Sequence, residues 1–438
     1  ANETERIVAL NTTYVVSALS RQEMEQGVAG WAELLEFLQQ FAQSSNPQQQ
    51  ELAMRLFYAL TETVGTVFQP HFTDLKQLYG TVLANAKDSR VRVAALKAAG
   101  ALIDFLSSGE DVLLFRDLVP LIISGLESNL EDEALAVQIL EVITQLAESP
   151  EPILNRYIKQ VVQVLVVIIR SESVDLGTKK VAIQTLCTVL ACKSRFVAKI
   201  GAVAPLLDTA IACLAWDYPR FVQVLSEQEL TQKQIEEQNE QDNGDEDEML
   251  CDFGQSVVTA LTMHLPPRLM FMPILETAFK RIASTQVSPN GVPDVWVGLS
   301  LLLHSTAGLA EQLIEKQVLE KLLSAVVPIA QTSPDPINRA TAVMCMAEWV
   351  QNLAPVIWTY MPSMLPTAIA LLGDPASNLV RSCAGDVIEL ICDEIAEDLL
   401  MPFLDELVQK LLPLCSLGVN ATVQSTALSA LSCVMVTT

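Results

Sequence analysis

The amino-acid sequence predicts an all-α protein, a right-handed superhelical solenoid of about nine helix pairs preceded by a lone helix. The first observation is an amphipathic helix pair that recurs about every forty residues. The second is the composition: half of the 438 residues are hydrophobic but only 5% are aromatic, which suits many thin layers of Leu, Val, Ile and Ala. The third is the glycine count of 17, too low for an all-β chain with frequent tight turns.

Turn signals and apolar spacing predict where each helix begins. A leading helix is expected over Glu3 to Ser20. First helices of the pairs are expected to begin near Trp31, Pro70, Asp111, Pro152, Arg195, Pro267, Glu315, Pro355 and Leu399. Second helices are expected near Pro47, Ser89, Glu131, Val174, Asp252, Val292, Asp335, Pro375 and Val419. Several of these starts place proline in the first turn of a helix, where its missing N–H costs nothing.

A short motif at the second helices identifies the type of repeat. Asp88 precedes Arg92 by four residues, Asp335 precedes Arg339 by the same spacing, and small residues follow in both places. The small residues permit close helix packing, and the Asp and Arg can hydrogen-bond between neighbouring repeats. In this motif the chain resembles the HEAT repeat family. The resemblance implies that the second helices line the concave wall of the solenoid.

One interval interrupts the repeat and divides the chain into three parts. HEAT repeats are expected over 1–215 and 252–438, with the array truncated at both ends, and an acidic, largely flexible insertion over 216–251. Its start, Phe221 to Gln238, is compatible with a short helix. Its tail cannot bury enough apolar surface to offset the entropy of ordering. The predicted partner-binding carboxylates are Glu236, Glu237, Glu240, Asp242, Asp245, Glu246, Asp247 and Glu248. A tolerated surface loop is the alternative.

The sequence offers no grouping of residues typical of an enzyme. His71, His264 and His304 are far apart and show no metal-ligand spacing, and no phosphate loop or nucleophile elbow occurs. We therefore expect no catalytic residues, no metal and no cofactor. The apolar runs are too short to predict a membrane span. The nine cysteines, odd in number and without a C-x-x-C pair, indicate a reducing compartment.

The formal net charge of −25 bears on the choice of partner. An acidic array repels nucleic-acid phosphate and anionic membrane surfaces and attracts basic proteins. We expect basic protein partners, no direct contact with nucleic acid or membrane, and a monomeric array. Solubility alone is the other reason for an acidic surface.

Polar stripes on predicted second helices are the candidate contacts for a basic partner. Asp386, Glu389 and Asp393 share one face at spacings of three and four residues, and Glu397 continues it. Stacked carboxylates of this kind suit the Lys and Arg side chains of an extended peptide; an ordinary solvated helix face is the alternative. The full candidate set is Glu141, Glu148, Glu348, Trp349, Asn352, Asp386, Glu389, Asp393 and Glu397. We interpret Trp349 itself as a packing residue first.

The repeats, the acidity and the insertion together resemble the importin-beta (karyopherin-beta) superfamily of nuclear transport receptors, and within it the importin-4 and importin-5 type. The likeness rests on the acidic run Asp242 to Glu248 inside one repeat, on Leu371 to Gly385, and on the early repeat that opens at Trp31. The resemblance implies a fragment of a nuclear import receptor that shuttles between cytoplasm and nucleus through the nuclear pore. Its expected partners are basic cargo such as histones and ribosomal proteins, the GTP form of the GTPase Ran, which regulates release, and phenylalanine–glycine nucleoporins.

Other readings of the same array remain open. A HEAT scaffold that assembles a protein complex outside transport is the main alternative, although such a scaffold does not need the acidic insertion. A tubulin-binding HEAT module is disfavoured because tubulin is itself acidic. An enzyme is disfavoured because no converging catalytic groups are present.

Overall fold

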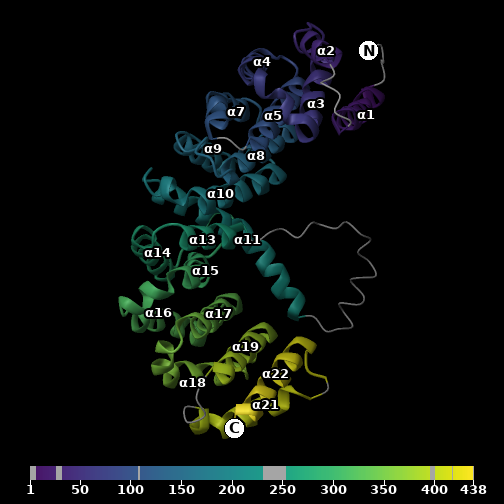
Figure 1. Ribbon diagram of the computed structural model, residues 1–438. Helices are drawn as coiled ribbons and strands as arrows, with labels where there is room; N and C mark the ends of the chain where they lie inside the picture. The colour runs from purple at the N-terminus through teal and green to yellow at the C-terminus, as the bar shows by residue number, and fades with distance from the viewer. Residues whose placement is uncertain are drawn as a thin grey trace. The chain divides into compact units, whose positions relative to one another are not determined.

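The computed structural model describes residues 6–25, 32–106, 109–229, 253–394, 400–416 and 418–437. These residues form helices and turns, without a β-strand among them, and one isolated bridge joins Val287 and Pro293. The chain divides into two compact units, Ala1–Gly201 and Ala202–Thr438, which are described separately (Figure 1). The predicted all-α class is confirmed.

Unit 1 consists of the lone helix α1 and four helix pairs. Each pair joins a first helix, sometimes broken by a 3-10 turn, to a longer second helix. The elements are α1 (Arg6–Glu25), α2 (Ala32–Ala42), α3 (Pro47–Val64), η1 (Gly65–His71), α4 (Phe72–Asn85), α5 (Ser89–Phe105), α6 (Gly109–Leu114), η2 (Phe115–Leu118), α7 (Val119–Glu127), α8 (Glu133–Glu148), α9 (Ile158–Arg170) and α10 (Leu176–Val197).

Unit 2 consists of five further pairs. The elements are α11 (Val203–Glu229), α13 (Phe253–His264), α14 (Pro267–Ile282), α15 (Asp294–Glu315), α16 (Leu319–Thr332), α17 (Pro336–Leu353), η3 (Val356–Tyr360), α18 (Met361–Leu371), α19 (Asn378–Glu394), η4 (Met401–Phe403), α21 (Leu404–Leu414) and α22 (Ala421–Thr437). Within the described residues, the prediction of about nine pairs after a leading helix is therefore confirmed.

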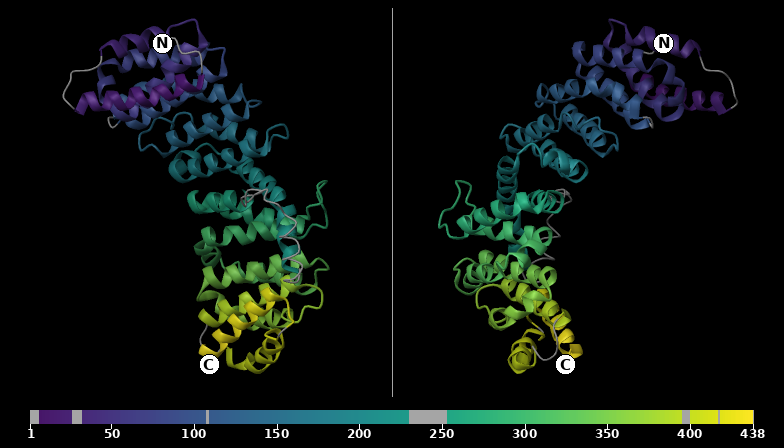
Figure 2. Two further views of the ribbon diagram at one scale, coloured as in Figure 1. Left: turned by 90° about the vertical axis from the view of Figure 1, so that its right-hand side faces the viewer. Right: turned by 60° about the vertical axis from the view of Figure 1, so that its left-hand side comes forward.

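The second helices of consecutive pairs form a continuous packed row in each unit. In unit 1 the row runs α3, α5, α8, α10, and in unit 2 it runs α13, α15, α17, α19, α22 (Figure 2). First helices pack beside one another in a second row, for example α4 with α7 and α16 with α18. Aliphatic side chains fill the space between the rows: Leu140, Leu186, Val343 and Ile388 are each 0–2% exposed. Each layer thus buries its apolar face against the next.

Aspartate caps explain why the second helices begin where the sequence predicts. The carboxylate of Asp88 accepts a hydrogen bond from the Arg90 N–H, and that of Asp132 from the Leu135 N–H. Asp175 and Asp335 cap α10 and α17 in the same way. Each cap is worth about 1 kcal/mol. The largest error among the predicted second-helix starts is small, with Pro375 expected and Asn378 observed.

Three first helices begin four or more residues later than predicted, and the smallest of these errors is at α16, which begins at Leu319 rather than near Glu315. α9 begins at Ile158 rather than near Pro152, because residues 151–157 form a series of turns. α11 begins at Val203 rather than near Arg195, because α10 continues to Val197 through a bend at Lys193, whose φ is −123°. The Lys193 side chain is 8% exposed and its Nζ donates a hydrogen bond to the Ser149 carbonyl, 2.7 Å away. The bend therefore carries a buried contact to α8.

α11 also ends later than predicted. The sequence indicated an end near Ala215, followed by the insertion, but the helix runs on to Glu229 with Pro219 inside it. Pro219 disfavours a helix interior locally, so the prediction stopped too early. Tertiary contacts of the second half, described below, explain the continuation. Residues 216–229 of the expected flexible insertion are thus helical.

α15 is a core helix despite its apolar length. It is the one helix in the described residues that is long and apolar enough to cross a membrane, yet 61% of its most apolar window is buried inside the structure. Its side chains pack against α13, α14 and α17. Burial between two rows of helices accounts for its composition.

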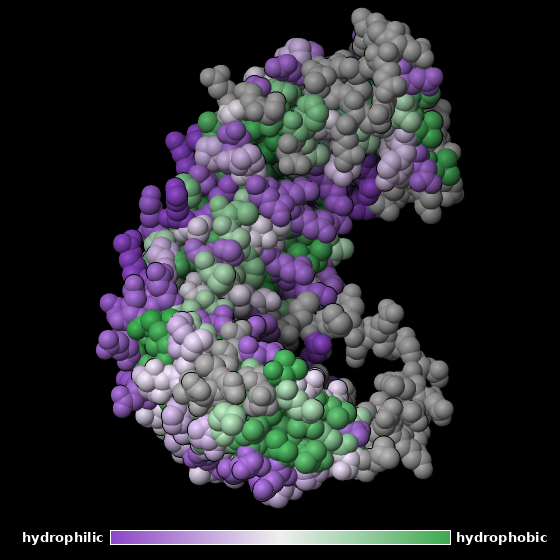
Figure 3. Space-filling model, turned by 60° about the horizontal axis from the view of Figure 1, so that its bottom comes forward, coloured by the Kyte–Doolittle hydropathy of each residue, from purple (hydrophilic) through white to green (hydrophobic). Residues whose placement is uncertain are grey.

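The last layer exposes an apolar face. On α22, Leu428 is 50% exposed, Met435 73% and Val436 84%. Apolar surface gathers at this end of unit 2 in the space-filling view (Figure 3). In a repeat array such a face is the surface on which a neighbouring layer packs.

Candidate peptide-binding surface

The carboxylate stripe on α19 lies where the sequence predicted it. Asp386 and Asp393 are exposed and Glu389 is half-buried. The opposite face, with Val380, Ala384 and Val387, is 0% exposed and packs in the core. The spacing of three and four residues therefore does separate a core face from an open acidic face.

The surroundings of the stripe shift the protonation of one of its carboxyl groups, that of Asp386. Partial burial of its carboxyl group, together with the neighbouring charge of Glu389, raises the pKa of Asp386 to about 6. Desolvation and like charge both disfavour the ionised form. A Lys or Arg side chain placed beside this pair would relieve the repulsion, which is the electrostatic property expected of a cation-binding surface.

The stripe ends beside the next second helix. Burial and the neighbouring carboxylate of Asp393 raise the pKa of the Cys433 thiol, on α22, to about 11. Asp393 thus faces α22 as well as solvent. Glu397, the predicted continuation, lies outside the described residues.

Two polar residues nearer the start of α19, at the same helical spacing as the stripe, are not open. Ser382 is 5% exposed. Asn378 is half-buried, and its Oδ1 accepts a hydrogen bond from Nη1 of Arg381 at 3.2 Å. The open stripe therefore does not extend to the start of α19. The layers approach closely here: a Cβ added at Gly385 would lie 3.1 Å from the Thr426 side chain.

α17 contributes a carboxylate but not an aromatic contact. Burial raises the pKa of Glu348, and Nδ2 of Asn352 donates a hydrogen bond to Glu348 Oε1 at 2.8 Å. Trp349 is 1% exposed, so its ring packs in the core, as interpreted from the sequence, and cannot contact a ligand. Asn338, near the start of α17, is 7% exposed and therefore buried.

Unit 1 holds the other predicted contacts. Glu141 and Glu148 are both exposed on α8, two turns apart on one face. Gln145 is exposed between them, whereas Gln138, at the start of this stripe, is only half-buried. These carboxylates form a second acidic stripe within unit 1.

The eight predicted carboxylates of the insertion, Glu236 to Glu248, lie outside the described residues. The structure does describe the base of this segment. The carboxylate of Asp217 on α11 accepts hydrogen bonds from the backbone N–H groups of Phe253, at 3.1 Å, and of Gly254, at the start of α13. One side chain therefore closes the base of the insertion and caps the helix that follows it.

An aromatic cluster holds the second half of α11, and sequence reasoning missed it. The rings of Tyr218 and Phe221 lie 4.9 Å and 5.4 Å from the ring of Trp296 in the first turn of α15. Burial and the charge of Asp335, which caps α17, raise the pKa of Tyr218. This half of α11 also contacts α19. Aromatic residues at helical spacing after Ala215 were the available signal.

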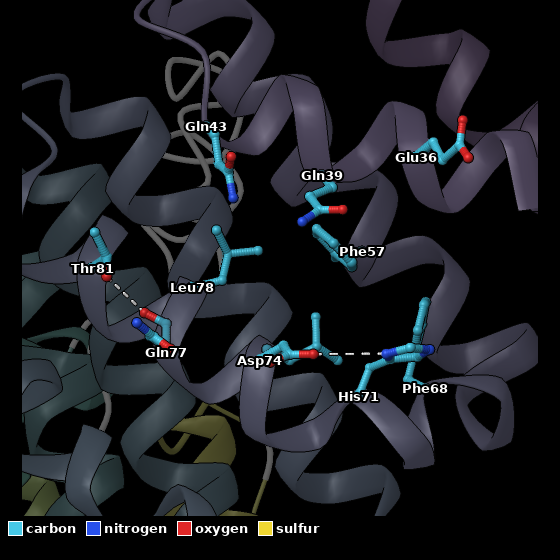
Figure 4. Close-up of a pocket in the computed structure, with 11 residues that line it drawn as sticks. Glu36, Gln39, Gln43, Phe57, Phe68, His71, Asp74, Gln77, Leu78 and Thr81 are labelled. Atoms are coloured by element: carbon cyan, nitrogen blue, oxygen red, sulfur yellow. Dashed lines mark hydrogen bonds and ion pairs between the residues drawn. The ribbon is translucent and has the colours of Figure 1, made fainter.

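Two pockets lie between first helices of neighbouring pairs, and the sequence did not locate either one. The larger, of about 440 Å³, lies in unit 1 between α2 and α4, with Phe57, Phe68 and Leu78 beside Gln39, Gln43 and Asp74 (Figure 4). His71 and Asp74 face each other at its rim, with Nδ1 and Oδ2 3.8 Å apart. The smaller, of about 260 Å³, lies in unit 2 between α16 and α18 and is lined by Leu323, Val327 and Tyr360.

The described residues contain no group of three or more His, Cys, Asp or Glu side chains that could hold a metal ion. His304 has its pKa lowered to about 4 by burial, so its imidazole is neutral near pH 7. The acidic stripes are therefore surfaces of separate carboxylates along helices rather than converging ligand sets.

Comparisons with known proteins agree with this architecture. The family model described as IPO5-like, TPR repeats matches residues 6–164. Human importin-4 is 26% identical over 381 residues, which is 84% of this chain and 33% of importin-4. Importin subunit beta-3 of Saccharomyces cerevisiae is 22% identical over 413 residues, 89% of this chain and 34% of that protein. The chain thus spans about a third of the length of these relatives.

Among solved structures, Kap121p superposes with a TM-score of 0.78 at 18% identity, over 93% of this chain and 38% of Kap121p. The fold and its stripes define a helical-repeat array of the HEAT solenoid class, as predicted. The sequence relatives agree with that class: the chain is similar to importin-4 over most of its length and, over residues 6–164, to the importin-5 type.

Proposed function

We propose that this chain is the part of a nuclear import receptor that holds basic cargo proteins on its acidic stripes, with release controlled by Ran-GTP. The observation that carries the proposal is the α19 stripe, where Asp386, Glu389 and Asp393 crowd on one open face. Histone tails and ribosomal proteins have the matching chemistry of Lys-rich and Arg-rich extended segments. The receptor would be monomeric and would shuttle between cytoplasm and nucleus.

Relatives support the regulatory part of the proposal. Solved structures include Kap121p bound to RanGTP, Kap121p bound to Pho4p and Kap121p bound to Nup53p. By analogy, this chain would share a Ran-dependent change between cargo-holding and cargo-free arrays. Small rotations between layers add along a solenoid, so a partner bound at one place can bias the shape elsewhere.

The test is capture of the full-length receptor on an immobilised histone-tail peptide, with and without Ran-GTP. The wild-type receptor should bind and Ran-GTP should release it. The variant Asp386→Asn, Glu389→Gln, Asp393→Asn should bind roughly three- to 100-fold more weakly, since each exposed ion pair is worth roughly 0.2–1 kcal/mol.

The matched control neutralises Glu311, Glu315 and Glu320, which are exposed at the end of α15 and the start of α16 and give the same charge change. This control should retain binding. If neither the peptide nor Ran-GTP binds the receptor, the transport proposal fails, and a HEAT scaffold outside transport becomes the better reading. If both triple variants lose binding equally, net charge rather than the α19 stripe is responsible.

The two pockets between first helices are proposed docking sites for phenylalanine–glycine nucleoporin segments. Each has an apolar lining in a notch between two helices, which suits a single phenyl ring. Leu78→Arg and Val327→Arg would fill the pockets with charge and should weaken binding of a phenylalanine–glycine peptide, measured by anisotropy. Val167→Arg is the control, because Val167 is 62% exposed and lines neither pocket. Equal binding by all variants would exclude both pockets.

A further inference from the structure

Positive charge is concentrated in one stretch of this acidic chain. Residues 156–199 contain eight Lys or Arg and two Asp or Glu, a net charge of +6, whereas the whole chain carries −25. One of the eight, Lys193, is buried against Ser149. Most of the others remain at the surface of unit 1. The overall charge therefore conceals a local surface of the opposite sign.

Four of these cations gather at one end of the pair α9 and α10. Arg156 and Lys159 flank the start of α9, while Arg195 and Lys199 flank the end of α10. The two helices pack together and are joined by the short connection 171–175, so they run antiparallel and these ends coincide. All four side chains are exposed, and none forms an ion pair within the described part of the chain.

The surface continues across the preceding layers. Nζ of Lys76, on α4, lies 2.7 Å from Oδ2 of Asp117 in η2. This hydrogen bond and charge lower the pKa of Asp117, and Arg116 and Arg156 add to the lowering. Three cations from three successive first-helix segments thus surround one carboxylate. Lys76, Arg116 and Arg156 follow one another at intervals of 40 residues, one per repeat, and Arg195 lies near the end of α10, in the same pair as Arg156.

We propose that this basic edge, formed by Lys76, Arg116, Arg156, Lys159, Arg195 and Lys199, binds an extended acidic segment of a partner protein. The surface is distinct from the acidic stripes, and its ligand has the opposite charge to the proposed cargo. Lys76, Arg116 and Arg156 place one cation in each of three successive layers, and packed helix layers lie about 8–10 Å apart. An extended peptide rises about 3.3 Å per residue, so an acidic residue at every third position would meet one cation per layer.

Two features favour an acidic peptide over nucleic acid. The net charge of −25 repels a long polyanion that extends beyond the edge, whereas a short acidic segment stays within it. Proteins that bind single strands also offer open aromatic rings for base stacking. Here Tyr157 and Phe196 are half-buried, and Nζ of Lys199 lies over the Phe196 ring, 5.6 Å from its centroid.

The experiment measures anisotropy of a labelled peptide of about six Glu-Gly-Ser repeats, added to the full chain. Binding should weaken strongly between about 50 mM and 300 mM salt, as for exposed charges. The variant Arg156→Glu, Lys159→Glu, Arg195→Glu, Lys199→Glu should bind at least about tenfold more weakly. Circular dichroism should show that it keeps its helix content, since all four residues are exposed.

The control variant makes the same charge change elsewhere: Arg170→Glu, Arg268→Glu, Lys280→Glu, Lys316→Glu, all at exposed positions. It should bind the peptide within about threefold of the parent chain. Equal losses in both quadruple variants, or no binding by the parent at low salt, would overturn the proposal. So would tighter binding of a thymidine oligonucleotide of about 20 nucleotides, which would assign the edge to nucleic acid.

Discussion

Arg339 of α17 and Asp374, just before α19, form a buried two-pronged ion pair between neighbouring repeats. Nε of Arg339 donates to Oδ2 of Asp374 at 3.1 Å and Nη2 donates to Oδ1 at 3.1 Å. Nη1 donates to the Ser333 carbonyl at 2.8 Å, and Oδ1 of Asp374 also accepts from the Ala376 and Ser377 N–H groups at 2.9 Å. The expected bracing of adjacent repeats by Arg339 is confirmed, with its partner in the next repeat.

Arg339→Met should destabilise the α17–α19 layers by about 3–5 kcal/mol, because it leaves the buried Asp374 carboxylate without its counter-charge. Urea unfolding followed by circular dichroism, with hydrogen exchange of α17 and α19, measures the loss. The double variant Arg339→Met, Asp374→Leu should recover part of it. Arg92, whose Nη2 donates to the neutral Oδ1 of Asn129 at 2.8 Å, is the comparison. Equal costs for Arg92→Met and Arg339→Met would contradict this account.

Gly308→Ala should destabilise unit 2 by about 1–3 kcal/mol through overpacking. A Cβ at Gly308 on α15 would lie 2.5 Å from Oγ1 and 2.7 Å from the backbone carbon of Thr262 on α13. Gly125→Ala on α7 is the control, because its Cβ would meet only Ile139 Cδ1 at 4.0 Å. That substitution should leave the midpoint of thermal unfolding unchanged or raise it, as alanine favours the helix. A neutral Gly308→Ala would show that the layers can move apart freely.

Binding of a basic peptide should weaken as the pH falls from about 7.5 to 5, because the raised pKa of Asp386, about 6, lies in this window. The stability of the fold changes with pH in the opposite direction to peptide binding. A carboxyl whose folded pKa is raised favours the folded state below its unfolded pKa, and this contribution is lost as pH rises through about 6. Asp386→Asn should therefore raise the unfolding midpoint at pH 7.5 and flatten the pH dependence of binding. A pH profile identical in wild type and Asp386→Asn would exclude Asp386 as the titrating group.

Trp296→Ala should release the second half of α11 while leaving the helix pairs folded. An aromatic pair contributes about 0.5–1.5 kcal/mol beyond its buried area, and Trp296 pairs with both Tyr218 and Phe221. Amide hydrogen exchange at residues 216–223 should accelerate by roughly tenfold or more, with α16 and α17 unaffected. Met272→Ala, at a side chain 53% exposed on α14, should change nothing. Uniform acceleration across unit 2 would mean that Trp296 supports the core rather than α11.

The local parts of the fold were predictable because they depend on neighbouring residues. Asp-capped starts such as those at Asp88 and Asp335, and the core face of α19, follow from capping and helical periodicity alone. The end of α11 did not follow, because Trp296 lies far along the chain from Tyr218. The same holds for the burial of Ser382, which is 5% exposed, and for the acceptor of Arg339, which lies one repeat away.

Of the candidate site, the exposed carboxylates at Glu141, Glu148, Asp386 and Asp393 and the half-buried Glu389 were found because an amphipathic helix separates charged from apolar side chains. The pockets between first helices were not found from the sequence. Each pocket is lined by residues of two helices, and the hydrophobic period of one helix does not predict which helix packs beside it. The basic edge was also missed, because its cations come from three helix pairs far apart in the sequence and the net charge of −25 hides them.

The hydrogen bonds from the Phe253 and Gly254 N–H groups to the Asp217 carboxylate hold the start of α13 directly on α11, whatever sequence lies between the two helices. The length and sequence of the acidic segment can change without altering how α11 pairs with α13, because the solenoid is already continuous at its base. A protease cut within the segment would leave two chains that stay joined as one folded array. Asp217→Ala would remove the two hydrogen bonds that hold the start of α13 on α11.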